Sequence, residues 1–359
     1  MDNIDILDTI IKGDCIEQLK NISTNSIDLI FADPPYNMQT DGVLKRTDGS
    51  KFNGVEDKWD KFNSLKEYDD FCKKWLKECK RVLKDDGSIW VIGSFQNIYR
   101  LGYIMQDLGF WILNDVIWFK PNAVPNFAGT RFQNSHETLL WCSKNKNSKY
   151  HFNYKTMKEL NGGKQMQSVW NIGICIGNER LKDENGIKVH STQKPEKLLY
   201  NIIISSTAVG DVILDPFFGT GTTGVVAYRL GRHFIGIEKD EFYIKYANKR
   251  INNTLVETDI FSNMELEVKP PKISVKELIN RGYIKENDFM YSRDKKNKVK
   301  ILSNGNVCDL ENNNELSIHK MSAKFLNLSN NNGWNYFYVY YNNEFILIDK
   351  LRYRANEDK

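Results

Sequence analysis

Short apolar runs alternate along the chain with stretches of helical periodicity. Ile27–Phe31 and Ser88–Ile92 are apolar runs of strand length. Between them, residues 68–83 repeat apolar side chains at the spacing that predicts an amphipathic helix, which we expect Gly87 to end. Strands that alternate with helices in this way are typical of a parallel α/β sheet.

Later segments extend this pattern and interrupt it once. The apolar runs 116–119 and 138–141 are predicted to form an antiparallel pair. Residues 143–190 are polar, rich in Lys, Asn and Gly, and without steady periodicity, so we expect an inserted, DNA-facing region there. Helix and strand patterns then return from Pro195 to about Asn253.

Two prolines, Pro270 and Pro271, mark the clearest boundary in the chain. The run 334–341 beyond them is too aromatic for a disordered arm, which predicts a small second domain. We therefore expect a first domain over residues 1–268 and a C-terminal domain over residues 269–359.

Composition narrows the class of protein. With 41% apolar and 27% charged residues, the chain has the balance of a soluble globular protein. No apolar run approaches the roughly 18 residues that cross a bilayer, and the first residues lack the pattern of a signal peptide. We expect a cytoplasmic protein with no membrane partner. Six scattered cysteines without clustered histidines predict neither disulfides nor a metal site.

Charge is unevenly distributed. Residues 1–271 carry 35 basic and 35 acidic side chains, whereas residues 272–359 carry 15 basic against 11 acidic ones. The net charge of +4 therefore comes entirely from residues 272–359. A basic segment on a neutral body favours a polyanion such as nucleic acid, although random imbalance on a solvated surface would look the same.

The first chemical motif is Asp33-Pro34-Pro35-Tyr36, directly after an apolar strand. Ligands of open α/β sheets bind at the carboxyl ends of strands. Proline has no N–H, so the Asp33 carboxylate and the Pro34 carbonyl are presented as acceptors without competing donors from the prolines. Two acceptors suit an exocyclic amine, and Tyr36 offers a ring on which a base can stack. A plain strand-ending turn is the alternative.

The second motif is a glycine turn between a strand and a helix. Asp215 ends an apolar strand, Gly219 and Gly221 follow, and a helix is predicted to begin at Thr222. The spacing also suits a dinucleotide. Asp215 favours S-adenosylmethionine modestly, because a carboxylate repels a pyrophosphate but attracts a cationic amino-acid end. Glu238, at the end of the next strand, suits the ribose hydroxyls of either cofactor.

These residues resemble the amino-group DNA methyltransferases of the permuted beta order, in which Asp-Pro-Pro-Tyr precedes the glycine loop. The resemblance covers essentially the whole chain and is strongest to the GANTC-specific adenine-N6 enzymes of the HinfI type, and more distantly to the CcrM type. The shared segments are residues 31–36, 92–100, 191–195 and 317–324. Ala123 departs from the Asn-Pro of the family pattern, which affects local loop geometry.

The resemblance implies a Rossmann-like α/β sheet with helices on both faces, a small C-terminal domain, and S-adenosyl-L-methionine as cofactor. It implies that Asp14 accepts from the amino group of the cofactor's adenine. The catalytic residues that it implies are Asp33, Pro34, Pro35 and Tyr36. The implied cofactor-binding residues are Asp14, Cys15, Gln193, Lys194, Pro195, Asp215, Phe217, Gly219, Gly221, Thr222, Thr223 and Glu238.

DNA contacts are expected in both domains, because the C-terminal extension of the GANTC enzymes contributes to DNA recognition. A helix end is the structural alternative for His319 and Lys320, and a place in the core is the alternative for Trp334. The candidates are Arg46, Trp59, Arg131, His319, Lys320 and Trp334.

The sequence thus predicts methyl transfer to N6 of a flipped adenine in double-stranded GANTC, without a metal. Protection of DNA from a cognate restriction endonuclease would be its role, and a palindromic target is compatible with a homodimer. Alternatives are cytosine N4, adenine in RNA, or a non-catalytic DNA-binding protein. A cytosine-C5 enzyme is excluded because no cysteine here follows a proline.

Overall fold

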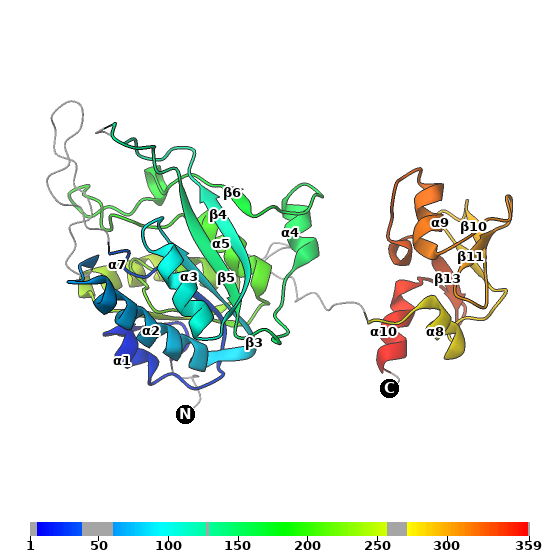
Figure 1. Ribbon diagram of the computed structural model, residues 1–359, viewed down its shortest axis with the longest axis horizontal. Helices are drawn as coiled ribbons and strands as arrows, with labels where there is room; N and C mark the ends of the chain where they lie inside the picture. The colour runs from blue at the N-terminus through cyan, green and yellow to red at the C-terminus, as the bar shows by residue number, and fades with distance from the viewer. Residues whose placement is uncertain (1–5, 38–59, 127–128, 257–270, 358–359) are drawn as a thin grey trace. The chain divides into compact units, whose positions relative to one another are not determined.

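The structure, a computed structural model, describes residues 6–37, 60–126, 129–256 and 271–357 (Figure 1). The chain divides into two compact units, Met1–Glu267 and Val268–Lys359. Each unit has its own sheet and its own hydrophobic core.

The first unit is built on a mixed eight-stranded sheet in the order β1-β8-β7-β2-β3-β5-β4-β6. The first five strands of this order are parallel, β5 is antiparallel to β3 and to β4, and β6 is parallel to β4. The strands are β1 (Thr9–Lys12), β2 (Ile27–Ala32), β3 (Leu83–Gly93), β4 (Trp111–Phe119), β5 (His136–Ser143), β6 (Val169–Asn171), β7 (Val212–Asp215) and β8 (His233–Glu238).

Helices cover both faces of this sheet, which confirms the expected fold class. One core joins α1, α2 and α3 to one face, and a second core joins α5, α6 and α7 to the other. Figure 1 shows α2 and α3 in front of the strands and α5 behind them. The helices are α1 (Cys15–Leu19), α2 (Leu65–Val82), α3 (Ile98–Asp107), α4 (Tyr154–Leu160), α5 (Glu196–Ser206), α6 (Thr222–Arg229) and α7 (Glu241–Asn252), with a 3₁₀ turn η3 (Gly177–Glu179).

The end of α2 differs from the expectation. Ser64 caps the helix by accepting from the Glu67 N–H at 3.1 Å, but the helix ends at Val82 and not at Gly87. Leu83 is buried and already extended, so β3 begins there and Gly87 lies inside the strand. A Cβ at Gly87 would lie 2.9 Å from the Asp28 carbonyl oxygen, so this glycine permits β3 to pass close to β2.

The antiparallel pair predicted from the apolar runs is confirmed, since β4 and β5 pair from Trp111–Ser143 to Phe119–His136. The polar region 143–190 is less irregular than expected. It contains α4, which packs on α5, and β6, which extends the sheet beyond β4. Trp170 explains this placement, because its buried ring packs against Trp90.

The second unit is an antiparallel six-stranded sheet, in the order β12-β11-β10-β9-β13-β14, with helices packed on one core. Among the residues described in either unit, no helix is long and apolar enough to cross a membrane. The elements are α8 (Val275–Asn280), β9 (Phe289–Tyr291), β10 (Lys298–Ile301), β11 (Val307–Asp309), β12 (Glu315–Leu316), α9 (Ile318–Phe325), η4 (Gly333–Asn335), β13 (Tyr338–Tyr341), β14 (Glu344–Leu347) and α10 (Asp349–Glu357).

Candidate active site

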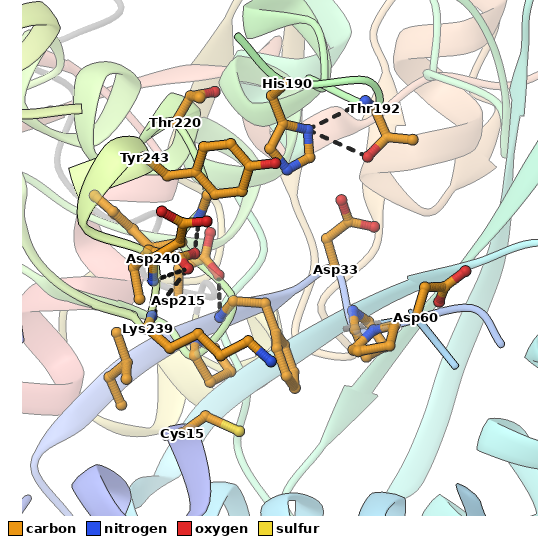
Figure 2. Close-up of a pocket in the computed structure, with 18 of the residues that line it drawn as sticks. Cys15, Asp33, Asp60, His190, Thr192, Asp215, Thr220, Lys239, Asp240 and Tyr243 are labelled. Atoms are coloured by element: carbon orange, nitrogen blue, oxygen red, sulfur yellow. Dashed lines mark hydrogen bonds between the residues drawn. The ribbon is translucent and has the colours of Figure 1, made fainter. Parts of the chain in front are cut away.

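Three parallel strands end in or beside acidic residues that line one pocket of about 360 Å³. Asp33 follows β2, Asp215 ends β7 and Glu238 ends β8. In the view of Figure 2, Asp33 and Asp60 lie toward one side of the pocket and Asp215 toward the other. Both motifs of the sequence therefore meet at the carboxyl edge of the sheet, where open α/β folds bind their ligands.

Asp215 is held as a buried carboxyl at the glycine loop. Its Oδ1 accepts from the Phe217 N–H at 2.9 Å and its Oδ2 accepts from the Thr223 hydroxyl at 2.6 Å. Burial raises its pKa to about 7, against the lowering effect of these two hydrogen bonds. A neighbouring cation would restore the charged form, so the pocket favours a ligand with a positive group here.

The turn itself needs glycine at two positions. Gly219 and Gly221 have φ values of 50° and 78°, and Gly221 is the residue from which α6 begins. A Cβ at Gly221 would lie 2.9 Å from the Cβ of Ala247 on α7. Thr222 starts the helix as predicted, and its hydroxyl accepts from Arg250 at 3.0 Å.

Glu238 is tied to the same loop by backbone donors. Its Oε2 accepts from Gly219 N–H at 2.8 Å, and its Oε1 accepts from the N–H groups of Lys239 and Asp240 at 2.9 Å. Three of the roughly four acceptor positions of a carboxylate are thus used. Burial nevertheless raises the pKa of Glu238. A more basic carboxylate is a stronger hydrogen-bond acceptor, so it suits the two hydroxyl groups of a diol.

Asp14 and Cys15 lie on the pocket wall at the start of α1. Asp14 caps this helix, since its Oδ1 accepts from Ile16 N–H at 3.0 Å. Burial raises the pKa of the Cys15 thiol to about 12, so it is a packed neutral group and not a nucleophile. Phe217 also lines the pocket, with its ring edge-on to Trp75 at 5.2 Å.

Residues 193–195, directly before α5, include one side chain that holds a neighbouring loop and one that pairs with Asp33. Gln193 is buried and holds the neighbouring loop, because its Oε1 accepts from Leu181 N–H at 3.0 Å and its Nε2 donates to the Glu179 carbonyl at 2.8 Å. Pro195 is the N-cap residue of α5. Lys194, expected at the cofactor, lines the pocket and donates its ammonium to Asp33 Oδ2 at 2.6 Å.

Asp33 is partly exposed, and its two carboxylate oxygens differ in their partners. Its Oδ2 is paired with Lys194, while Oδ1 is buried without a hydrogen-bond partner among the described residues. Burial raises the pKa of Asp33, and Lys194 acts in the lowering direction. Burial would lower the pKa of Lys194, but Asp33 and Glu137 outweigh it and raise that pKa, so the lysine is charged.

Glu137 on β5 completes a buried, charge-balanced centre that sequence reasoning missed. It accepts from the Tyr36 hydroxyl at 3.0 Å and from the Lys120 ammonium at 2.9 Å. Burial opposes its charge, yet Lys194 and Lys120 hold the pKa of Glu137 below its ordinary value. Lys194 also lies 5.2 Å from the centre of the Tyr36 ring.

Two further residues outside the motif hold its backbone. The buried Asp60 accepts from the N–H groups of Tyr36 at 2.5 Å and Asn37 at 2.8 Å. The Tyr68 hydroxyl on α2 donates to the Pro35 carbonyl at 2.9 Å. No sequence pattern marks these residues, because each comes from another element and reaches the motif only in the fold.

The structure describes four of the six expected DNA contacts. Arg46 and Trp59 lie outside the described residues. Arg131 is exposed in the loop between β4 and β5, with its guanidinium 5.6 Å from the Phe95 ring centre. In the second unit, His319 and Lys320 are exposed on α9, whereas Trp334 is buried with Arg352 4.2 Å above its ring.

The pocket fits the cofactor that the resemblance implies. A buried carboxyl with a pKa of about 7 suits a cationic amino-acid end, and the Glu238 carboxylate suits a ribose. Among the described residues, no three His, Cys, Asp or Glu side chains are grouped so that they could hold a metal ion. The fold and the site together define the class of protein: an α/β methyltransferase.

Comparison with known proteins identifies the family. Residues 27–249 match the N6/N4 family of DNA methylases, so the chain belongs to this family. It is 60% identical over 349 residues to the type II methyltransferase M.HinfI of Haemophilus influenzae, with 97% of both chains covered. It is also 45% identical to M2.LlaDCHI of Lactococcus lactis subsp. cremoris, over 68% of this chain and 88% of that relative.

Solved structures agree with this family and with the fold. The M1.HpyAVI–SAM complex is 25% identical with a TM-score of 0.51, over 68% of this chain and 98% of that one. The cytosine-N4-specific PvuII DNA methyltransferase, at 23% identity and a TM-score of 0.54 over 70% and 87% of the two chains, shares the fold. About a third of this chain therefore has no counterpart in M1.HpyAVI. The expected enzyme class, DNA methyltransferase, is confirmed.

Proposed function

We propose that this protein transfers the methyl group of S-adenosyl-L-methionine to N6 of an adenine flipped out of double-stranded GANTC. The observation that carries the proposal is the Asp33 carboxylate, which lines the pocket and has a buried oxygen without a hydrogen-bond partner among the residues that the structure describes. An acceptor in that state is completed by an N–H donor, and an exocyclic amine supplies one.

The chain's own residues act on the amine. Asp33 Oδ1 and the Pro34 carbonyl accept its two hydrogens, which orients the nitrogen lone pair and increases its electron density. Lys194 balances the Asp33 charge in the free protein, and Glu137 offers this ammonium a second carboxylate when the base enters. Tyr36 stacks on the base, with its hydroxyl anchored on Glu137.

The cofactor site is formed by Asp215, Glu238 and the turn at Gly219 and Gly221, with Asp14 and Cys15 on the opposite wall. When bound, S-adenosylmethionine would supply the methyl group: its S–C bond would break as the N–C bond forms, and S-adenosylhomocysteine would leave. Asp33, whose pKa burial raises, would accept the proton that the methylated amine loses. Asp215 would hold the cationic amino-acid end, and Glu238 would hold the ribose. Lys194 and Gln193 then act chiefly on the protein side of this pocket, through Asp33 and the loop at residues 179–181.

The choice of site rests on both units. M.HinfI aligns with 349 of the 359 residues, so at most ten residues of the 92-residue second unit lie outside this similarity. A methyltransferase without such a unit can still have the catalytic fold, as M1.HpyAVI shows by its length. We therefore assign sequence recognition in part to the second unit, with His319, Lys320 and Trp334 as candidates, and in part to residues 143–190, Arg46, Trp59 and Arg131 of the first unit.

The proposed biological role is the modification half of a type II restriction–modification system in the cytoplasm. The cognate restriction endonuclease is a functional partner: it acts on the same DNA site, and no physical contact with this protein is part of the proposal. A GANTC site offers equivalent adenines on its two strands, and a homodimer on that site is part of the proposal.

Transfer of labelled methyl from S-adenosylmethionine to two duplexes tests this function. One duplex carries a single GANTC site and the other carries the same bases scrambled. Label on adenine of the first duplex only is the expected result. Label on cytosine would overturn the base assignment, and equal label on both duplexes would overturn the site assignment.

A further inference from the structure

Four charged side chains next to the Asp-Pro-Pro-Tyr motif form two buried ion pairs. Asp33 accepts from Lys194 at 2.6 Å, and Glu137 accepts from Lys120 at 2.9 Å. The exposed fractions of the four side chains are only 7% to 19%. We call these four residues the charge cluster. Its two positive charges equal its two negative ones. Because a buried ion without a partner is strongly unfavourable, any change of charge within the cluster must be balanced there.

The fold brings the second of these pairs to the motif from the antiparallel part of the sheet. Glu137 is the second residue of β5 and lies opposite Trp118 of β4, and Lys120 directly follows β4. Both residues therefore lie at the same edge of the sheet as Asp33, which follows β2. The Tyr36 hydroxyl connects the motif to this pair, because it donates to Glu137 at 3.0 Å.

Lys194 is within electrostatic reach of both carboxylates. Its ammonium donates to Asp33 and lies 5.2 Å from the centre of the Tyr36 ring, whose hydroxyl contacts Glu137. Asp33 and Glu137 both raise the pKa of Lys194. The ammonium is at the end of a flexible four-carbon stem, so it can exchange one carboxylate for the other without a change of the backbone.

The two carboxylates differ in how readily they take up a proton. Burial raises the pKa of Asp33, Lys194 opposes this effect, and the charge of Glu137 adds to it. Burial also acts on Glu137, but Lys194 and Lys120 outweigh it and keep the pKa of Glu137 below its ordinary value. A proton released beside the cluster is therefore taken up by Asp33, while Glu137 stays charged.

We propose that Glu137 is a positioning residue for methyl transfer, which takes over the Lys194 ammonium when Asp33 accepts the proton of the methylated amine. The proposal rests on the proposed function. One N–H bond of the amine breaks and one O–H bond forms on Asp33, so that Asp33 becomes neutral. Lys194 and Glu137 keep their own protonation states, and only their pairing changes. After the product leaves, Asp33 releases its proton to water and Lys194 returns to it.

The neutral state of Asp33 can be tested without methyl transfer. Asp33→Asn replaces the protonated carboxyl by an uncharged side chain of nearly the same shape. In a crystal structure of this variant, we expect the Lys194 ammonium within hydrogen-bond distance of a Glu137 carboxylate oxygen. An ammonium that stays at residue 33, or that turns to solvent, would overturn the proposal.

Thermal unfolding of the cofactor-free protein gives a second test that needs no activity. Asp33→Asn should lower the melting temperature only slightly, because Glu137 still balances Lys194. The background Glu137→Gln/Lys120→Met removes the second pair and leaves the cluster neutral, so Asp33→Asn should cause a larger loss there. The matched control background is Glu17→Gln/Lys20→Met, which removes an exposed ion pair at 2.8 Å on α1. Equal losses in the two backgrounds would contradict the exchange of partners.

Single-turnover methyl transfer at saturating cofactor measures what the exchange contributes to the reaction. Glu137→Gln/Lys120→Met should slow transfer about 100-fold, because Lys194 then has no second carboxylate, while the KM for DNA and the cofactor affinity stay unchanged. Tyr36→Phe loses the hydroxyl contact but keeps the charge of Glu137, and should slow transfer only about fivefold. A loss in the double variant no greater than that of Tyr36→Phe would make Glu137 only an anchor for this hydroxyl, and would overturn the proposal.

The unaltered protein is assayed in parallel on the duplex with a GANTC site. Absence of label on adenine there would contradict the proposed function. The crystal structure of Asp33→Asn and the unfolding series test the exchange of partners by themselves, so the two failures are distinguishable.

Discussion

Two contacts between a lysine and an aromatic ring, one in each unit, differ in burial. In the pocket of the first unit Lys194 lies 5.2 Å from the Tyr36 ring centre at 7% exposure, ion-paired with Asp33. In the second unit Lys298 lies 3.8 Å from the Phe289 ring centre and is exposed. The buried lysine must be charge-balanced, because a lone buried ion is strongly unfavourable. The exposed lysine needs no partner and can exchange its contacts for a polyanion.

The comparison predicts that the largest effects arise where charge is buried. Asp33→Ala should lower the rate of methyl transfer by about 10³-fold, because the acceptor that orients the amine is lost. Cofactor binding, measured by titration calorimetry, should stay nearly unchanged. Asp69→Ala, which removes an acid from the surface ion pair with Arg100, is the control and should keep full activity.

Asp33→Ala also removes one of the two carboxylates, Asp33 and Glu137, that balance the charge of the buried Lys194. A double variant with Lys194→Met separates the two effects, since it removes the unpaired charge. Restored thermal stability without restored transfer is the expected result. Full transfer by either variant would contradict the role of Asp33.

The ring and the hydroxyl of Tyr36 have different expected contributions to base capture, and two substitutions separate them. Tyr36→Ala should weaken capture of the target base by about 1–3 kcal/mol, which is the usual contribution of stacking. Tyr36→Phe keeps the ring and loses the hydrogen bond to Glu137, so it should lose only about 1 kcal/mol. Single-turnover rates at limiting DNA measure both. Equal losses would show that the hydroxyl, and not the ring, is what matters.

Burial also makes cofactor binding depend on pH. The pKa of Asp215 is raised to about 7, so the acid is increasingly neutral below pH 7 and loses its attraction for a cation. Cofactor affinity should therefore rise about tenfold from pH 6 to pH 8 and then level off. In Asp215→Asn the affinity should be low and flat across this range. An unchanged pH profile in that variant would assign the titration to another group.

The same shift sets the sign of a stability effect in the cofactor-free protein. A raised pKa means that the folded state favours the protonated carboxyl of Asp215. Its contribution to the free energy of unfolding is complete below about pH 4 and is lost as the pH rises through about 7. Thermal unfolding of the protein and of Asp215→Asn at pH 5 and pH 8 should show this difference.

The smallest effect is expected at an exposed lysine of the second unit. Lys320→Ala should weaken duplex binding a few-fold and reduce the salt slope by about 1, if its ammonium contacts one phosphate. Lys350→Ala, an equally exposed site on α10, is the control. Identical salt slopes for the two variants would remove Lys320 from the set of DNA contacts.

Sequence patterns located the parts of the site that are local in the chain. Asp33 and Asp215 each follow an apolar run, and the strand-end rule alone predicts that they share one sheet edge. Glu137, Lys120 and Asp60 were missed because burial and partners, and not neighbours in sequence, define what they do.

Two features of the fold differ from the prediction for the same reason, namely that the prediction used only neighbouring residues in the sequence. Gly87 is a helix stop by propensity, yet the buried Leu83 had already begun β3. Residues 169–171 have no strand pattern of useful length, yet Trp170 packs against Trp90 and brings them to the sheet. Tertiary packing determined the start of β3 and the placement of residues 169–171. A window of neighbouring residues carries no information about such packing.

The contact of Asp60 with Tyr36 and Asn37 has a consequence for how such enzymes diversify. It joins the two ends of the segment 38–59 beside the catalytic motif. Substitutions, insertions or exchange of that segment between relatives would thus leave the catalytic backbone held at the same anchor. Because Arg46 and Trp59 of that segment are proposed DNA contacts, we expect exchanges there to alter target preference more than the chemistry of methyl transfer.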